Sequence, residues 1–174
     1  MSMTFINFHE VTSSTEATVT FSNIPQEYTD LVVFVAARTP RAATNDGILM
    51  TVNGGGSSVA KLTYANVGAG VTVVSSTAFL INANSSTSGA FSNVEIYIGD
   101  YAGEDHKPYI INGVVENNAQ QAFPHWSGGS FSTTSAISSI TFDAEVDAYF
   151  SIGSKFYLYG ITAGSDGTTT VSVV

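Results

Sequence analysis

Cysteine is absent from this 174-residue chain, and lysine and arginine together number only five. Without cysteine there is no disulfide framework and no thiolate metal site, and nothing ties the fold to an oxidising compartment. The five basic residues against 14 acidic ones give a net charge of −9. Because phosphate backbones are bound by clustered Lys and Arg, this balance argues against a nucleic-acid partner.

Long hydrophobic runs are missing as well. No stretch approaches the roughly 18 consecutive apolar residues of a membrane span, and the N-terminus lacks the basic start and apolar run of an export signal. We therefore expect neither membrane insertion nor Sec export. The chain also lacks the P-loop, HExxH, Rossmann, EF-hand and Ser-His-Asp elbow patterns. The missing motifs do not by themselves exclude an enzyme, but the protein is expected to be non-enzymatic and without a cofactor.

Charge of either sign is scarce, since charged residues make up 11% of the chain against about 25% in an average soluble domain. Ser, Thr, Ala and Asn are frequent instead. A surface of small uncharged groups suits permanent packing against neighbouring proteins, because little charge is desolvated when a contact forms. The alternative is a secreted or repeat-like β-domain whose strands are simply rich in Thr and Ser.

Hydrophobic residues recur with a period of two, which is the pattern of half-buried strands. Within residues 16–22, Ala17, Val19 and Phe21 alternate with hydroxylated side chains. The run at 30–38 is apolar on both faces and rich in β-branched residues, which predicts a central strand. Further strands are expected at residues 5–9, 47–53, 60–66, 71–81, 93–99, 108–116, 140–143, 154–161 and 168–174.

Polar and glycine-rich segments separate these strands. Asn53-Gly-Gly-Gly is expected to form a hairpin tip, and Trp126-Ser-Gly-Gly is expected to be a loop. About ten short strands without an intervening helix favour antiparallel pairing. Residues 1–174 are therefore predicted to form a single all-β domain, an antiparallel two-sheet β-sandwich that is jelly-roll-like.

Two acidic groupings are the candidates for site chemistry. Asp143, Glu145 and Asp147 would share one strand face, and Ca²⁺ prefers several carboxylate oxygens, so they are the candidate metal ligands. A solvated strand end explains the same three residues without a metal. The second grouping consists of Asp100, Glu104, Asp105 and His106. These side chains could supply an acid, a base or a metal ligand within one loop. An exposed turn is the simpler interpretation.

Aromatic side chains are the third candidate. Tyr157 and Tyr159 alternate with Phe156 and Leu158, so the tyrosines are expected on the face opposite the core. Trp126 is expected to be exposed on its loop. Exposed Trp and Tyr rings bind sugars and also anchor protein interfaces. Either a glycan platform or an inter-subunit contact fits these three residues, and so does a Trp ring folded back on its own sandwich.

Two stretches resemble a domain that recurs in virion proteins of tailed bacteriophages. Residues 19–38 read VTFSNIPQEYTDLVVFVAAR and match the opening pattern F-x-x-I-P-x-x-Y-T-D-L. Residues 137–142, ISSITF, and residues 153–161, GSKFYLYGI, match the closing pattern that ends G-S-x-F-x-L-Y-G-I. Together they bracket most of the chain. The motif residues are structural and include no catalytic group.

The resemblance implies a β-sandwich on the virion surface, in head decoration, tail fibre or tail accessory proteins. Because the motif fills a chain that starts at Met1 with no fibre shaft before it, we expect a stand-alone capsid decoration (cement) subunit. Such a subunit would be made and assembled in the host cytoplasm. It would bind other virion proteins as a homo-oligomer, with a trimer as the first expectation. A tail fibre or tail accessory protein that binds a host glycan is the alternative, and a hydrolase using the 100–106 loop is a third.

Overall fold

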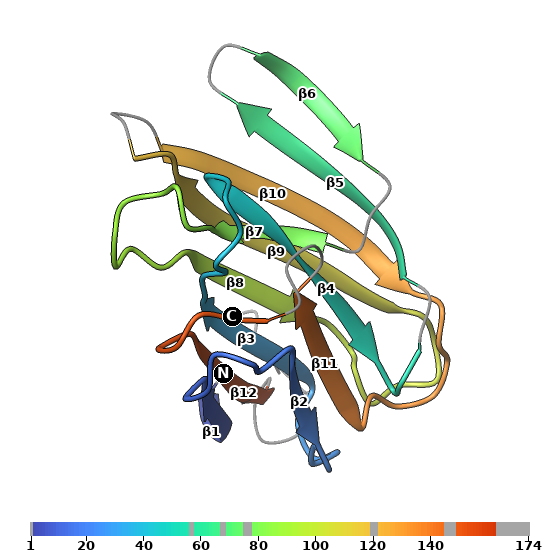
Figure 1. The fold of residues 1–174 in the computed structure, drawn as a ribbon. Coiled ribbons are helices and arrows are strands. Elements are labelled where there is room, and N and C mark those ends of the chain that lie inside the picture. The colour runs from blue at the N-terminus through green and yellow to red at the C-terminus, as the bar shows by residue number, and fades with distance from the viewer. Residues whose placement is uncertain are drawn as a thin grey trace, which may run out of the picture.

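Two antiparallel sheets make up the fold (Figure 1). A computed structural model describes residues 2–55, 58–66, 69–74, 78–118, 122–144 and 149–162. This part of the chain contains strands and loops but no helix. The strands are β1 (Ser2–Glu10), β2 (Thr18–Ser22), β3 (Asp30–Ala36), β4 (Asn45–Val52), β5 (Ser58–Asn66), β6 (Ala69–Val74), β7 (Ala78–Asn82), β8 (Asn93–Ile98), β9 (Lys107–Glu116), β10 (Ala122–Phe131), β11 (Ser139–Ala144) and β12 (Lys155–Thr162).

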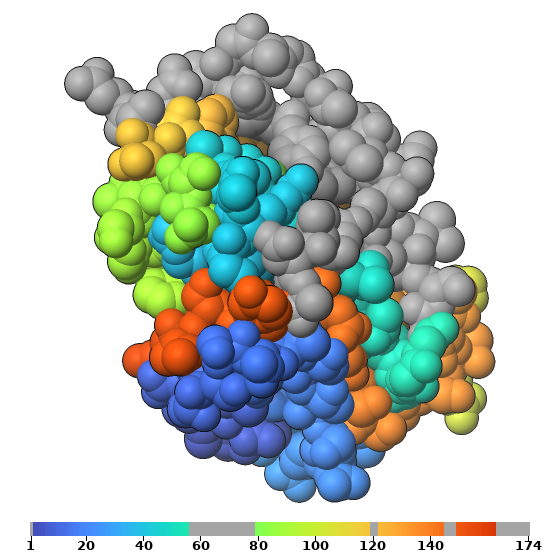
Figure 2. All heavy atoms as spheres, viewed as in Figure 1, coloured from blue at the N-terminus to red at the C-terminus, as the bar shows by residue number. Residues whose placement is uncertain are grey.

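The two sheets differ in size. The large sheet has the strand order β1-β12-β3-β8-β9-β10-β5-β6, and the small sheet has the order β2-β11-β4-β7. The small sheet packs over the large one (Figure 1), so the predicted all-β sandwich is confirmed. The jelly-roll-like connectivity is not confirmed by this strand order. Figure 2 shows the N-terminal residues beside the last described ones, as the pairing of β1 with β12 requires.

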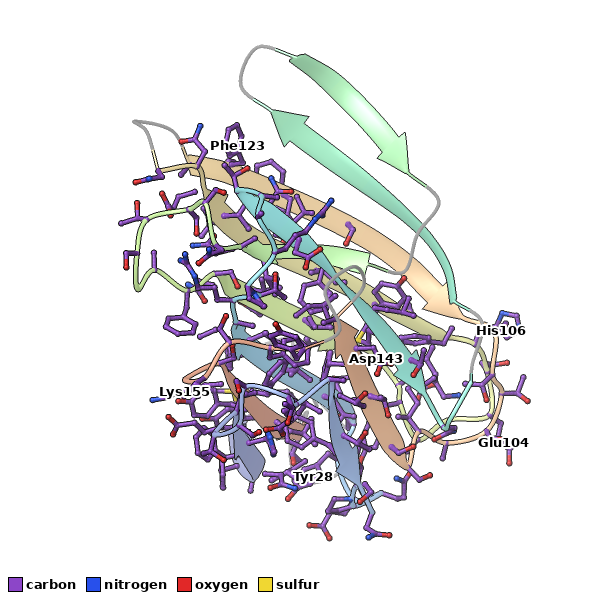
Figure 3. All side chains as sticks on the ribbon, viewed as in Figure 1. Tyr28, Glu104, His106, Phe123, Asp143 and Lys155 are labelled. Carbon is purple, nitrogen blue, oxygen red and sulfur yellow. The ribbon has the colours of Figure 1, made fainter. Side chains whose placement is uncertain are left out.

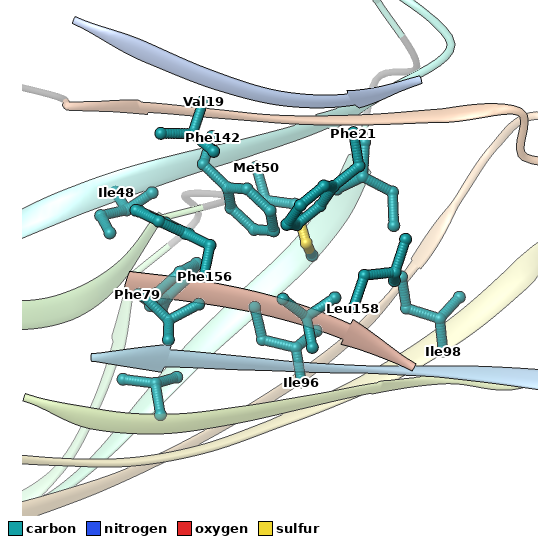
Figure 4. Packing of buried hydrophobic residues seen from close by; sticks show 14 of the residues in the cluster. Val19, Phe21, Ile48, Met50, Phe79, Ile96, Ile98, Phe142, Phe156 and Leu158 are labelled. Carbon is teal, nitrogen blue, oxygen red and sulfur yellow. The ribbon is translucent and has the colours of Figure 1, made fainter. Parts of the chain in front are cut away.

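The core fills the space between the sheets, because alternate residues of each strand point inward. Phe142 of the small sheet lies at its centre, with its ring centroid 5.4 Å from that of Phe156 in the large sheet. Phe21 and Phe79 approach Phe142 edge-on, at 6.4 and 6.3 Å (Figure 4). Each buried side chain of this size contributes about 1.5–3 kcal/mol of hydrophobic stabilisation. This aromatic contact joins the two layers.

Strand β3 has the central place that its sequence predicts. It lies between β12 and β8. Leu31, Val33 and Val35 face the core and are fully buried, while Val32 on the opposite face is also buried. A strand with neighbours on both sides and apolar residues on both faces is the environment in which β-branched residues are favoured.

Some predicted elements need correction. The single strand expected at 71–81 is two strands, β6 and β7, which belong to different sheets. Asn53 and Gly54 do form a turn, with φ of 51° and 73°. However, this turn connects β4 of the small sheet to β5 of the large sheet, so it is not a hairpin tip. A positive-φ signal locates a turn but does not say which strands pair. The strand expected at 168–174 lies outside the described residues.

Residues of the opening motif hold the turns of the sandwich together. The Asp30 carboxylate accepts a 2.9 Å hydrogen bond from the Asp100 amide, so it satisfies the turn after β8. The Pro25 carbonyl accepts a hydrogen bond from the hydroxyl of buried Tyr101. The motif therefore acts through long-range contacts between loops, which its local sequence pattern does not reveal.

A buried arginine organises the loop between β7 and β8. The Arg38 guanidinium is unpaired with any carboxylate among the described residues, and instead donates five hydrogen bonds to this loop. The acceptors are the Ser86 hydroxyl at 2.9 Å and the carbonyls of Asn84, Ser86, Thr87 and Ala90 at 3.0, 3.3, 2.7 and 2.9 Å. These five hydrogen bonds satisfy the guanidinium without any bound anion. Arg38 therefore has a structural role.

Glu116, at the end of β9, holds the same loop. Its carboxylate accepts hydrogen bonds from the Thr87 amide at 2.5 Å, the Thr87 hydroxyl at 2.9 Å and the Asn118 amide at 2.7 Å. Desolvation by itself would raise the pKa of Glu116, but these hydrogen bonds stabilise the charged form and lower the pKa overall. The loop is thereby tied to β9 as well as to Arg38, which follows β3.

Gly160 of β12 leaves room for the ring of Tyr28. A Cβ at this position would overlap the Tyr28 ring atoms. Gly160 lies inside β12, two residues before the strand ends. The closing motif contains glycine here because an aromatic ring from the opening motif covers the backbone.

We expect Gly160→Ala to lower the free energy of unfolding by about 2 kcal/mol, because the added methyl group forces Tyr28 out of its contact. Denaturant titration measures this loss. Gly128→Ala in β10 is the matched control, since among the described atoms a Cβ there meets only the Tyr109 carbonyl oxygen at an ordinary 3.6 Å. Equal stability of Gly160→Ala and the wild type would contradict the packing described for Tyr28.

Candidate functional site

The outer face of the large sheet carries a continuous row of aromatic and polar side chains. Strand register places one residue from each of six neighbouring strands in this row: Phe8, Tyr157, Phe34, Glu95, Asn112 and Trp126. Directly opposed residues of antiparallel strands share a face of the sheet. The side chains therefore line up across the strands, on the side away from the core.

One end of this row is an aromatic patch, defined here as Phe5, Phe8, Tyr157 and Tyr159. The rings of Phe8 and Tyr157 lie 4.8 Å apart, and those of Phe5 and Tyr159 lie 5.7 Å apart. Phe5 is 56% exposed and Phe8 is 40% exposed. The tyrosines face away from the core, as predicted, since Phe156 and Leu158 are fully buried.

A bulge in β1 creates this patch. The register of β1 against β12 shifts between Phe5 and Asn7, so Phe5 pairs with Tyr159 and Phe8 pairs with Tyr157. Two residues three positions apart thus project from the same face, which a regular strand does not allow. The period-of-two pattern therefore gave no sign of the patch.

Charged side chains lie at the end of the patch and not within it. Lys155 approaches the Glu10 carboxylate at 3.8 Å, and His9 contacts Glu16. An apolar centre with charge at its margin is the composition of a protein interface.

The other end of the row forms a groove of about 300 Å³. Its lining comes from β3, β8, β9 and β10 and consists of Phe34, Asn93, Glu95, Asn112, Gly113, Val114 and Trp126. Trp126 is 49% exposed. Glu95, Asn93 and Asn112 are solvent-exposed, and within the described residues their side chains make no hydrogen bond or ion pair. The groove therefore offers one carboxylate and two amides beside aromatic rings.

Trp126 corrects the predicted loop. It lies in the middle of β10, which pairs with β9 on one side and β5 on the other. Its neighbours His125 and Ser127 point inward and are buried. The glycines that follow Trp126 suggested a loop, but Gly128 and Gly129 continue both ladders. Consequently the indole is held by a paired strand.

His125 is buried on the inner face of β10. Neither ring nitrogen has a hydrogen-bond partner in the described structure. A Cβ on Gly113 would overlap the imidazole, so this glycine provides the space for the ring. Desolvation lowers the pKa of His125 to about 4. The imidazole is therefore neutral at pH 7.

The predicted calcium ligands are only partly described. Asp143 is the penultimate residue of β11 and accepts a 2.6 Å hydrogen bond from the Thr18 hydroxyl. Glu145 and Asp147 lie outside the described residues. Among the residues that are described, no three His, Asp or Glu side chains gather where they could hold a metal ion.

The acidic and histidine side chains of the 100–106 loop lie at the surface. Glu104, Asp105 and His106 are exposed, and Glu104 and His106 project at one end of the molecule (Figure 3). Buried Lys107 holds the loop by donating to the Gly103 carbonyl at 2.7 Å and to the Asp105 carbonyl. The contacts of this loop are therefore those of a structural turn.

Comparison of the chain with protein-family models, with curated proteins and with solved structures gives no match. In the part of the chain that is described, no helix is long and apolar enough to cross a bilayer. The outer face of the large sheet, with its aromatic patch and its groove, is the candidate functional site.

Proposed function

We propose that this protein is a non-enzymatic subunit of the surface of a tailed bacteriophage particle, a capsid decoration protein that binds other virion proteins through the aromatic patch. The observation that carries this proposal is the exposure of Phe5 and Phe8 on the outer face of the large sheet. The resemblance of residues 19–38 and 153–161 to virion β-sandwich domains supports the location.

The aromatic patch has the chemistry of an interface. Phe and Tyr are enriched in the buried centre of protein contacts, whereas Lys, Glu and Asp are depleted there. Met3 extends the apolar surface along β1 and is 53% exposed. Contiguous exposed apolar surface on a soluble protein marks an interaction site. A neighbouring virion subunit that covers the patch would remove these rings from water.

Strand β1 adds a second reason to expect association. It pairs with β12 along one side, and within the described residues no strand pairs with its other side. Neither proline nor lysine occurs in its nine residues, so two of the usual devices that block edge pairing are missing, and the bulge between Phe5 and Asn7 is the device that β1 does contain. This edge supports the proposed homo-oligomer, with a trimer as the first expectation.

A tail fibre or tail accessory protein that binds a host glycan is the second candidate function. The groove beside Trp126 supports it, because the groove combines an aromatic face with unpartnered polar groups. In this alternative the chain still belongs to the virion surface, but the groove binds a ligand from the host cell.

Particle reconstitution tests the decoration function. Virions of a strain that lacks the gene are mixed with purified protein, and bound subunits are counted by cryo-electron microscopy. Wild-type protein is expected to fill a repeated position on the particle. The double variant Phe5→Ser/Phe8→Ser is expected to bind at least tenfold more weakly, since two exposed aromatic contacts are lost.

Ile152→Ser is the matched control, because Ile152 is 59% exposed but lies in the loop before β12. It should bind like the wild type. Unchanged binding of the double variant, or wild-type protein that leaves such particles bare, would refute the proposal. Sedimentation of the purified protein as an 18.2 kDa monomer at every concentration would exclude the homo-oligomer.

A further inference from the structure

We infer that the groove lined by Phe34, Glu95, Asn112 and Trp126 binds a neutral saccharide. The inference supplies the ligand chemistry for the second candidate function, and does not depend on docking through the aromatic patch. Phe34 lies at the border between the two regions. Its ring centroid is 5.8 Å from that of Tyr159 in the patch, and the same residue lines the groove.

Strand spacing sets the width of the groove. Phe34 and Trp126 come from strands separated by two others, β8 and β9. At about 4.8 Å per strand, their backbones are roughly 14 Å apart. The intervening row positions hold Glu95 and Asn112, whose smaller polar side chains form the floor between the two aromatic residues. A volume of about 300 Å³ is at the small end for ligand sites, which suits one or two sugar rings.

The polar groups match hydroxyls better than they match any ion. A carboxylate only accepts hydrogen bonds, whereas the amides of Asn93 and Asn112 both donate and accept. Sugar hydroxyls also donate and accept, so they can satisfy all three groups at once. A guanidinium or ammonium only donates, which leaves the amide N–H groups unmatched. A phosphate is anionic and is therefore repelled by Glu95 and by a net charge of −9.

The indole supplies the apolar part of the site. Trp126 is half exposed and is held by pairing on both sides of β10, so little ordering is needed when a ligand stacks on it. One face of a pyranose ring presents C–H groups, which pack on an aromatic face while the hydroxyls at its edge remain free. A pyranose ring that stacks on Trp126 can therefore reach Glu95 and Asn112, the polar floor of the groove, with its hydroxyls.

Tryptophan fluorescence reports directly on this groove, because Trp126 is the only tryptophan in the chain. The purified protein is titrated with methyl glycosides of glucose, galactose, mannose and N-acetylglucosamine, and is screened on an array of neutral oligosaccharides. We expect a saturable change in emission with at least one of them. Arginine amide and sodium phosphate are the comparison ligands and should give no saturable change.

Variants locate the binding. Asn112→Leu and Glu95→Ala should each weaken binding about tenfold, the effect of losing one well-placed hydrogen-bonding group. Trp126→Ala, measured on the array, should abolish it. Ile110→Ala is the matched control, because Ile110 is 56% exposed on the same face of β9 but does not line the groove. Circular dichroism checks that every variant keeps the sheet signal.

Three results would overturn the inference. The first is no response to any saccharide on the array, and the second is full binding by Asn112→Leu and Glu95→Ala. The third is a saturable response to arginine amide alone, which would assign the groove to a basic side chain of a protein partner. Each of these is measured on the purified protein, so it is distinct from failure of the particle reconstitution.

Discussion

Arg38→Met is expected to lower the free energy of unfolding by about 4 kcal/mol. The substitution removes all five hydrogen bonds of the buried guanidinium, and although the Thr87 and Ala90 carbonyls keep one other donor each, the Asn84 and Ser86 carbonyls lose the donor described here. Unsatisfied buried polar groups of this kind cost about 1–3 kcal/mol each before the loop relaxes. In a protein of this size the loss corresponds to a fall in Tm of roughly 10 °C.

Arg41→Met is the matched control for this experiment. Arg41 makes a single 3.1 Å ion pair with Asp46, and its side chain is 37% exposed. Asp46 also keeps hydrogen bonds from the Thr39 hydroxyl at 2.8 Å and the Gly47 amide at 2.9 Å. Because Asp46 is fully buried and loses one of its hydrogen bonds, a loss of about 2 kcal/mol is expected, half of that for Arg38→Met. Equal losses for the two variants in denaturant titration would contradict the structural role given to Arg38.

The second large effect is a loss of stability on acidification that depends on His125. Its pKa is about 4 in the folded protein, against about 6.5 in an unfolded chain. Between these values the unfolded state binds more protons, so stability falls as the pH decreases from about 6.5 to about 4. The difference corresponds to about 3 kcal/mol, which is fully lost below pH 4 and fully present at pH 7.

Comparison with His125→Leu isolates this effect from the titration of carboxylates. The variant has no imidazole to protonate, and it also removes two buried nitrogens that lack hydrogen-bond partners in the described structure. Its stability relative to the wild type should therefore increase by about 3 kcal/mol from pH 7 to pH 4. Urea titrations at several pH values measure this difference. His106→Leu, at an exposed position, should follow the wild-type curve; a flat difference for His125→Leu would contradict the buried imidazole.

The sequence predicts the fold class well because period-two patterning records which side of each strand is buried. Val19 and Phe21 in β2, and Phe156 and Leu158 in β12, point into the core as their alternation indicates. Strand β10 was missed because its core-facing positions include His125 and Ser127 and its ladder continues through glycines. Pairing with β9 and β5 stabilises this strand, and such pairing partners are distant in sequence.

The candidate site was predictable only in part. Trp126, Tyr157 and Tyr159 were identified from the sequence, and the tyrosine face was predicted correctly. Glu95 and Asn112 were not identified as site residues, because their alignment with Trp126 depends on the register of three strands. Phe5 and Phe8 share a face only because of the bulge in β1. Register and bulges arise from contacts between strands, and a single sequence contains no direct signal for them.

The position of the two latest strands has a consequence for biosynthesis. β12 lies between β1 and β3, and β11 lies between β2 and β4. Strands from the first third of the chain therefore cannot complete their pairing until residues beyond 138 have been synthesised. While the ribosome is still translating, these early strands have open flanks and exposed apolar surface. Both layers are completed only after residue 162 has been synthesised. Folding of the sandwich is therefore expected to be slow, as is usual where most contacts join distant segments.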